Sequence, residues 1–116
     1  MTVCKRGDVV LVPFPFSDQT TTKKRPAVVI SSDAYNNVSS DIVIMAITSQ
    51  TEKAIVIEEC LITDWQGAGL LKPSAIKPAI STIEQALVLK KLGRLSPQDL
   101  ISMDIVLKKL LDLKTK

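Results

Sequence analysis

The chain has 116 residues, of which 46% are hydrophobic, and this composition can supply the core of one domain spanning residues 1–116. Its 15 basic and 12 acidic side chains leave a net charge of +3, which suits a polyanionic partner but is far from a histone-like tail. The sequence contains no histidine, which excludes Ser-His-Asp hydrolysis, Cys-His proteolysis, RNA hydrolysis by paired histidines, and metal sites that use histidine.

Short apolar runs separated by polar loops predict four strands in the first half of the chain. The β-branched run Val9–Val12 ends at two closely spaced prolines, and a polar loop leads to a second strand that begins at Pro26. The Ser-, Asn- and Asp-rich residues 32–41 predict a turn or a short helix. Residues 42–48 are apolar on both faces and predict a central strand, and residues 54–58 predict a fourth strand.

The second half of the chain predicts more strands and one helix. Residues 60–73 are interpreted as a loop, and residues 74–84 as two short strand pieces interrupted at Pro78. Residues 87–95 fit either a strand or a weak helix. A C-terminal helix then begins with Ser-Pro-Gln-Asp at residues 96–99, which supplies an N-cap serine, a proline in the first turn and a capping-box acid. The pattern predicts an antiparallel, strongly curved sheet or small barrel, with the helix over one open face.

A cluster of three basic residues, Lys23, Lys24 and Arg25, directly precedes Pro26 and the apolar strand that follows it. Charges in this position can simply protect an apolar strand from aggregation. Alternatively, a rigid strand is a good support for a cation that must meet an anion, and a guanidinium can bind two phosphate oxygens at once. The sequence has only four aromatic residues, which does not favour a nucleic-acid surface built on base stacking.

The sequence contains no candidate membrane span, because its longest purely apolar run, residues 42–47, is far shorter than the roughly 18 residues required. Its start lacks the apolar region of a signal peptide. The two cysteines, Cys4 and Cys60, do not form a disulfide framework and are expected to be inert, small hydrophobic side chains. We therefore expect a cytoplasmic protein with reduced thiols.

Five segments in order carry a resemblance to a known family: GDVVLVPFPF, KKRPAVVIS, IVIMAITSQ, GLLKPSAIKPAISTIEQ and KKLGRLSPQDL. Together they resemble the MazF/PemK family of type II toxin–antitoxin ribonucleases over nearly the whole chain. The resemblance implies an SH3-like antiparallel barrel with a C-terminal α-helix, a homodimer, and cleavage of single-stranded RNA without a metal or cofactor. It also implies a cognate antitoxin protein that neutralises the toxin.

The resemblance further implies which residues carry the chemistry. The family's catalytic arginine falls on Arg25, and its catalytic threonine falls on Thr48 at the end of the third predicted strand. Further candidates are expected to bind RNA: Phe16, Ser17, Lys23, Lys24, Ser49, Gln50, Ser74 and Lys77. Alternatives remain open for several of these. The two lysines can serve solubility, Phe16 can pack in the core or a dimer interface, and Ser49 and Gln50 can form an ordinary polar strand exit.

Three further expectations concern the site. The chain departs from the family at residues 77–79, Lys-Pro-Ala, where many relatives are more polar. This stretch is expected to help shape the RNA surface, so the departure leaves open both the RNA sequence that is cut and the strength of the activity. Glu84 ends a predicted strand and could orient Arg25. Asp8 follows Gly7 and is expected to stabilise the turn there.

The alternatives to a nuclease are a toxin of the same fold that binds a protein such as DNA gyrase, and a structural module without toxicity. The presence of both Arg25 and Thr48 favours the nuclease. RNA carries its own nucleophile, the 2′-hydroxyl, so the site needs mainly to align it and to stabilise the charged transition state.

Overall fold

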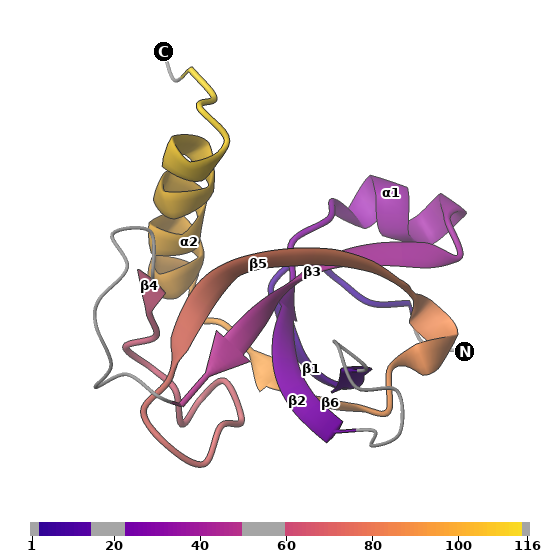
Figure 1. Cartoon of the computed structure of the whole chain (residues 1–116), viewed down its shortest axis with the longest axis horizontal. Helices are drawn as coiled ribbons and strands as arrows, with labels where there is room; N and C mark the ends of the chain where they lie inside the picture. Colours follow the sequence, from indigo (N-terminus) through magenta and orange to yellow (C-terminus); the bar gives the residue numbers. More distant parts are fainter. Residues whose placement is uncertain (1–2, 15–22, 50–59, 115–116) are drawn as a thin grey trace.

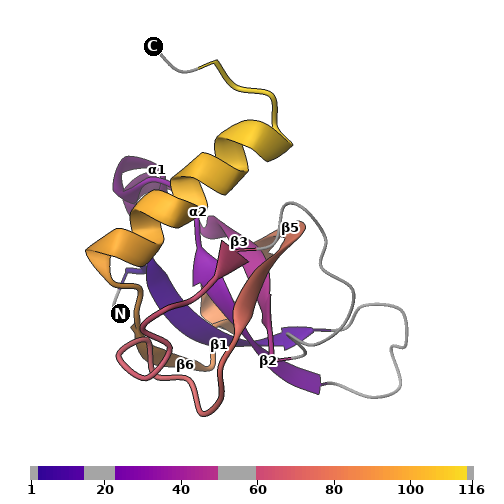
Figure 2. The same cartoon turned by 90° about the vertical axis from the view of Figure 1, so that its left-hand side faces the viewer.

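The computed structural model describes residues 3–14, 23–49 and 60–114, and it shows a curled antiparallel sheet with one long helix packed against it (Figures 1 and 2). Six strands are hydrogen-bonded in the order β4-β5-β3-β2-β1-β6. The strands are β1 Asp8–Phe14, β2 Lys23–Val29, β3 Asp41–Thr48, β4 Cys60–Leu61, β5 Ala75–Glu84 and β6 Lys90–Arg94. The helices are α1 Asp33–Val38, the 3₁₀ turn η1 Gln85–Leu87, and α2 Pro97–Leu110. The expected mainly β fold, here a curled half-barrel with a C-terminal helix, is confirmed.

Strands β1, β2 and β3 are buried on both faces, and this explains why they contain continuous apolar runs. Val9, Val28 and Met45 face one cluster of buried side chains, which also contains Met103 and Leu107 of α2. The alternate residues of the same strands form a second cluster, made of Val10, Val12, Ala27, Val29, Ile42 and Ile44 together with Cys4 and Ala46. The predicted central strand is confirmed, because β3 lies between β5 and β2.

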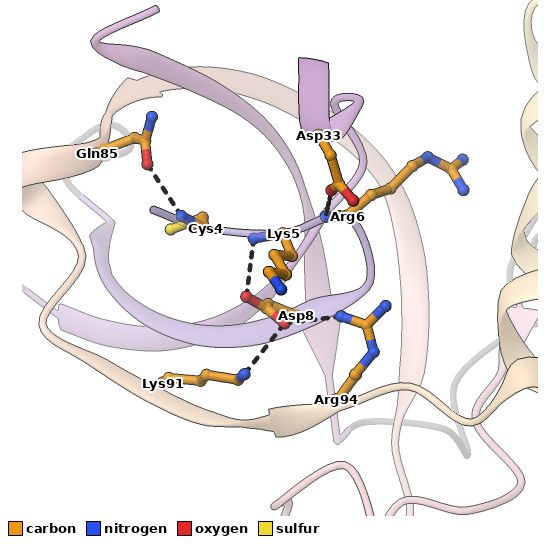
Figure 3. Close-up of polar contacts among 8 residues, drawn as sticks. All are labelled: Cys4, Lys5, Arg6, Asp8, Asp33, Gln85, Lys91 and Arg94. Atoms are coloured by element: carbon orange, nitrogen blue, oxygen red, sulfur yellow. Dashed lines mark hydrogen bonds and ion pairs between the residues drawn. The ribbon is translucent and has the colours of Figure 1, made fainter. Parts of the chain in front are cut away.

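Asp8 anchors the start of β1, as Figure 3 shows. Its buried carboxylate accepts a hydrogen bond from the Lys5 N–H at 2.9 Å and contacts Arg94 at 3.0 Å and Lys91 at 3.4 Å. Asp8 therefore stabilises the preceding turn, as expected, and also ties β1 to β6. Gln85 holds the segment before this turn, since its side chain accepts from the Cys4 N–H at 3.1 Å.

Strand β5 corrects the expectation of two pieces separated at Pro78. It is one strand of 10 residues that runs through the proline. Its register with β3 shifts between the pairs Met45–Ile80 and Ile47–Ile76, so Pro78 lies at an irregularity in the ladder. Such a position tolerates proline because the missing N–H interrupts no regular hydrogen bond.

The remaining expectations fall into three groups. Residues 87–95, which fit a strand or a helix by sequence, begin with the last residue of the short η1 turn and contain β6. The segment 60–73 is mainly loop and turn, although its first two residues form β4. The fourth predicted strand, residues 54–58, lies outside the described residues. No helix within the described ranges is long and apolar enough to cross a lipid bilayer.

Helix α2 begins as predicted, with Ser96 as its N-cap. The Ser96 hydroxyl accepts a hydrogen bond from the Asp99 N–H at 3.1 Å, and Pro97 occupies the first turn. The Asp99 carboxylate differs from the expected capping-box arrangement, because it accepts hydrogen bonds from Thr63 and Asp64 in the loop after β4. The start of α2 is thus joined to a loop 36 positions earlier in the chain.

Candidate functional site

A groove of about 670 Å³ lies at the end of the sheet where β2 begins and β3 ends. The start of β2 contributes Lys23–Pro26, the end of β3 contributes Ile47–Ser49, and the loop between β4 and β5 contributes Gly69–Lys72 and Ser74. In both Figures 1 and 2, the loop and the start of β2 lie at the same end of the sheet. Leu11 of β1 and Leu92 of β6 also line it, so the groove collects residues from five separate parts of the chain.

Strand β2 fixes the backbone position of Arg25. It pairs with Val12 of β1, and the next residues of β2 are locked into the sheet by buried Ala27, Val28 and Val29. The Arg25 side chain is exposed and lines the groove. A guanidinium on a paired strand keeps its charge at any biological pH and needs little reorganisation to meet a phosphate.

Thr48 lies on the neighbouring strand at the same level. Strands β2 and β3 pair Ala27 with Ala46, and the same antiparallel register extended by two residues places Arg25 opposite Thr48. Thr48 is the last residue of β3 and is partly buried, whereas Ser49 just beyond it is exposed. The groove thus brings together a cation and two hydroxyls, which are groups that can bind phosphate oxygens.

The wall formed by the loop after β4 is held close to β6 by two glycines. A Cβ atom on Gly69, whose φ is +82°, would lie 1.9 Å from the Leu92 carbonyl oxygen. A Cβ atom on Gly93 would lie 2.5 Å from the backbone of Ala68. The loop also closes on itself, because Leu70 N–H donates to the Trp65 carbonyl at 3.0 Å. The backbones are in contact here, so any larger side chain would push the wall away.

Asp99 of α2 holds the first part of the same loop, at Thr63 and Asp64. Its fully buried carboxylate accepts hydrogen bonds from the Thr63 N–H at 3.0 Å, the Thr63 hydroxyl at 2.8 Å and the Asp64 N–H at 3.0 Å. Burial by itself raises the pKa of Asp99, but the hydrogen bonds from Asp64, Thr63 and Ser96 outweigh it, so the pKa lies below its usual value. The charged form of Asp99 therefore stabilises the folded groove.

We expect Asp99→Asn to lower the free energy of unfolding by about 2–3 kcal/mol at pH 7, because an amide puts a donor against an N–H and loses charge-assisted hydrogen bonds. The lowered pKa makes the wild-type contribution complete above the unfolded-state pKa of about 4, and it is lost as the pH falls through the folded-state pKa. Denaturant unfolding at several pH values measures both effects.

The matched control for this experiment is Asp112→Asn, the same substitution at an exposed residue beyond the end of α2. It should leave stability near that of the wild type. If the stability difference between Asp99→Asn and the wild type did not shrink in acid, the carboxylate would not be acting through its charge.

Of the predicted RNA-binding residues, four line the groove, one does not, and three lie outside the described residues. Lys23, Lys24 and Ser49 line the groove with Arg25 and Thr48. Ser74 also lines the groove, but it is buried, and its hydroxyl donates to the Lys72 carbonyl at 2.8 Å. Lys77 is exposed on β5 and is not among the described residues that line the groove. Phe16, Ser17 and Gln50 lie outside the described residues.

The suggestion that Glu84 orients Arg25 is wrong. Glu84 pairs with Asp41 at the start of β3, whereas Arg25 lies level with Thr48 at its end. Asp41 and Thr48 are seven positions apart on β3, and this separates the two ends of the strand by roughly 23 Å.

Sequence reasoning also missed part of the groove, because Leu71 and Lys72 were interpreted only as loop. Both line the groove, and Leu71 is 93% exposed. A signal was present, since an apolar pair followed by a lysine stands between Gly69 and Pro73.

The two cysteines lie away from solvent, as expected for inert side chains. Cys4 and Cys60 are free thiols that are 9% and 5% exposed. Burial raises the pKa of both thiols, and the nearby charges of Asp8 and Asp99 raise the pKa of Cys4 and Cys60 respectively. Among the described residues, no group of three or more Cys, Asp or Glu is placed to hold a metal ion.

Solved structures share this fold at low sequence identity. An endoribonuclease in complex with its cognate antitoxin, from a mycobacterial species, is 17% identical with a TM-score of 0.78, and the match covers 97% of this chain and 99% of that one. MazF from Deinococcus radiodurans is 21% identical with a TM-score of 0.77, covering 97% and 100%. A MazE–MazF structure from the same organism is 19% identical with a TM-score of 0.75, covering 98% and 100%.

The amino-acid sequence itself also matches a model of a protein family. No curated protein sequence matches the chain. A family model described as a PemK-like, MazF-like toxin of a type II toxin–antitoxin system matches residues 5–111. This match includes β1 to β6 and all of α2. The chain therefore belongs to the family of PemK-like, MazF-like toxins of type II toxin–antitoxin systems.

Proposed function

We propose that this toxin is a sequence-specific endoribonuclease that cuts single-stranded RNA in the groove between β2, β3 and the loop Gly69–Ser74. The observation that supports the proposal is that Arg25 of β2 and Thr48 of the neighbouring strand β3 line one groove, which Lys23 and Lys24 also line. A polyanion fits this cluster of positive charge, and the mounted guanidinium can stabilise charge that develops at one phosphate.

The reaction follows from what these side chains can do. The RNA 2′-hydroxyl attacks the adjacent phosphorus, and the bond to the 5′-oxygen of the next nucleotide breaks. Arg25 stabilises the negative charge on the phosphate oxygens, and the Thr48 hydroxyl contributes hydrogen bonding at the same phosphate. A guanidinium holds its proton too tightly to act as a base near pH 7, so protons pass through water or a substrate oxygen.

The proposal extends to the protein's partners and location. The toxin works in the cytoplasm as a homodimer, and an acidic segment of the cognate antitoxin covers the groove. The positive charge of Lys23, Lys24 and Arg25 supports the last point, since a disordered acidic segment can fold onto such a surface. The solved relative that is described as bound to its cognate antitoxin is consistent with it.

The test is to incubate the purified protein with a long RNA that has both paired and unpaired regions, and to map the cuts. We expect cuts at one short sequence in unpaired regions, inhibition by the antitoxin, and a dimer mass by light scattering. Intact RNA together with inhibition of DNA gyrase would show instead a toxin that acts on a protein target.

A further inference from the structure

We infer that the groove has two chemically different sides, and that Leu71 binds the face of a nucleobase while the β2 cations hold the phosphates. This inference rests on the proposed function, and it assigns a base-binding role to a residue outside the catalytic pair. The ligand is one unpaired nucleotide of the RNA, next to the phosphate that is cut.

The first support is the division of chemistry within the groove. Its β2 side carries the exposed cations Lys23, Lys24 and Arg25. Its loop side carries Leu70 and Leu71, followed by one cation, Lys72. Apolar residues of β1, β3 and β6 also line the groove: Leu11, Ile47 and Leu92. A single strand of RNA has the same division, since charge lies on its backbone and apolar faces lie on its bases. Phosphates on the β2 side therefore direct bases toward the leucines.

The second support is the exposure of Leu71. It is 93% exposed, whereas its neighbour Leu70 is 9% exposed and packs against the buried cluster under α2. A scattered surface leucine would need no explanation, but Leu71 continues an apolar surface that lines a groove. Lys72 follows directly and lines the same groove, so a base on Leu71 has a cation beside its own phosphate.

The third support is that the loop is rigid where it carries Leu71. Gly69 contacts Leu92 of β6 through the backbone, the Ser74 hydroxyl holds the Lys72 carbonyl, and Asp99 holds the loop at Thr63. An apolar side chain on a fixed support loses little conformational freedom on binding. The described groove residues include no aromatic side chain, and among them Leu71 is the exposed apolar side chain available to a base face.

The experiment measures binding separately from cleavage. The ligand is a short RNA with the preferred sequence and a 2′-deoxy nucleotide at the cut site, together with versions that carry one abasic residue at each nearby position. In the wild type, we expect one abasic position to raise the Kd about tenfold, in line with loss of a base–side-chain contact. Leu71→Ala should raise the Kd for the complete RNA about tenfold. In this variant, an abasic residue at the same position should hardly raise the Kd further.

The matched control is Leu87→Ala, because Leu87 is also exposed but lies in η1, outside the groove lining. It should bind and discriminate like the wild type, and both variants should keep the wild-type thermal midpoint. An unchanged abasic penalty in Leu71→Ala would overturn the inference while leaving the nuclease intact. Weaker antitoxin binding with unchanged RNA binding would also overturn it, in favour of a protein segment on Leu71. A wild type that neither binds nor cuts RNA would overturn the proposed function itself.

Discussion

Arg25→Ala is expected to slow RNA cleavage by about 10²–10³-fold, which is the usual cost of removing one well-placed donor to a charged transition state. The side chain is exposed at the start of β2, so its removal leaves the buried clusters on both faces of the sheet untouched. The fold should therefore persist, and the thermal midpoint should stay close to that of the wild type. Growth inhibition on expression should disappear together with the cleavage.

Two companion variants separate the possible causes of this loss. Arg25→Lys keeps the charge but loses the planar, two-point contact with phosphate, so we expect activity between those of the wild type and Arg25→Ala. Lys90→Ala removes one exposed cation from β6 outside the groove lining and should cleave like the wild type. Cleavage by Arg25→Ala at the wild-type rate would falsify the assignment of Arg25.

The second large effect concerns the nucleophile. The sequence has no histidine and no closely spaced cysteine pair, so its side chains offer a poor cage for a catalytic metal ion. We expect cleavage to continue unchanged in EDTA. A substrate with one 2′-deoxy nucleotide on the 5′ side of the cut should bind but resist cleavage completely, because the attacking hydroxyl is missing.

The products identify the route independently. Attack by the 2′-hydroxyl leaves a 2′,3′-cyclic phosphate, or the 3′-phosphate to which it opens, and a 5′-hydroxyl on the other fragment. Mass spectrometry of a short cleaved oligonucleotide distinguishes these ends, and the all-ribose substrate is the control. Loss of activity in EDTA, or a 5′-phosphate product from the deoxy substrate, would contradict the mechanism.

The central sheet was predictable because its signal is local. The run from Ile42 to Ile47 is apolar at successive positions, and a strand covered on both faces buries most of it. The start of α2 was predictable for a similar reason, since Ser96 and Pro97 are adjacent capping signals. The cation side of the groove also lies within one short segment, and for this reason Lys23, Lys24 and Arg25 could be identified as candidates.

The loop side of the groove was not predictable from local patterns. It depends on Asp99 reaching Thr63, and on Gly69 contacting Leu92, and both contacts join segments that lie far apart in the chain. Lys77 failed to join the groove for a related reason. The irregularity near Pro78 changes how β5 pairs with β3, and a strand pattern read from sequence does not reveal such a shift.

Within the loop after β4, the residues that fix the position of the loop differ from the residues that are exposed in the groove. Gly69 and Gly93 set the position of the loop and admit no larger side chain, because a Cβ atom at either would collide with the opposite backbone. Leu71 and Lys72 are exposed side chains that contribute nothing to this contact. A toxin built in this way can change which nucleotides it reads by substitutions at two positions, while the loop that presents them stays in place. If Leu71 binds a base as proposed, the residues that read the RNA and the residues that fix the loop are then separate positions, with Gly69 only two residues before Leu71.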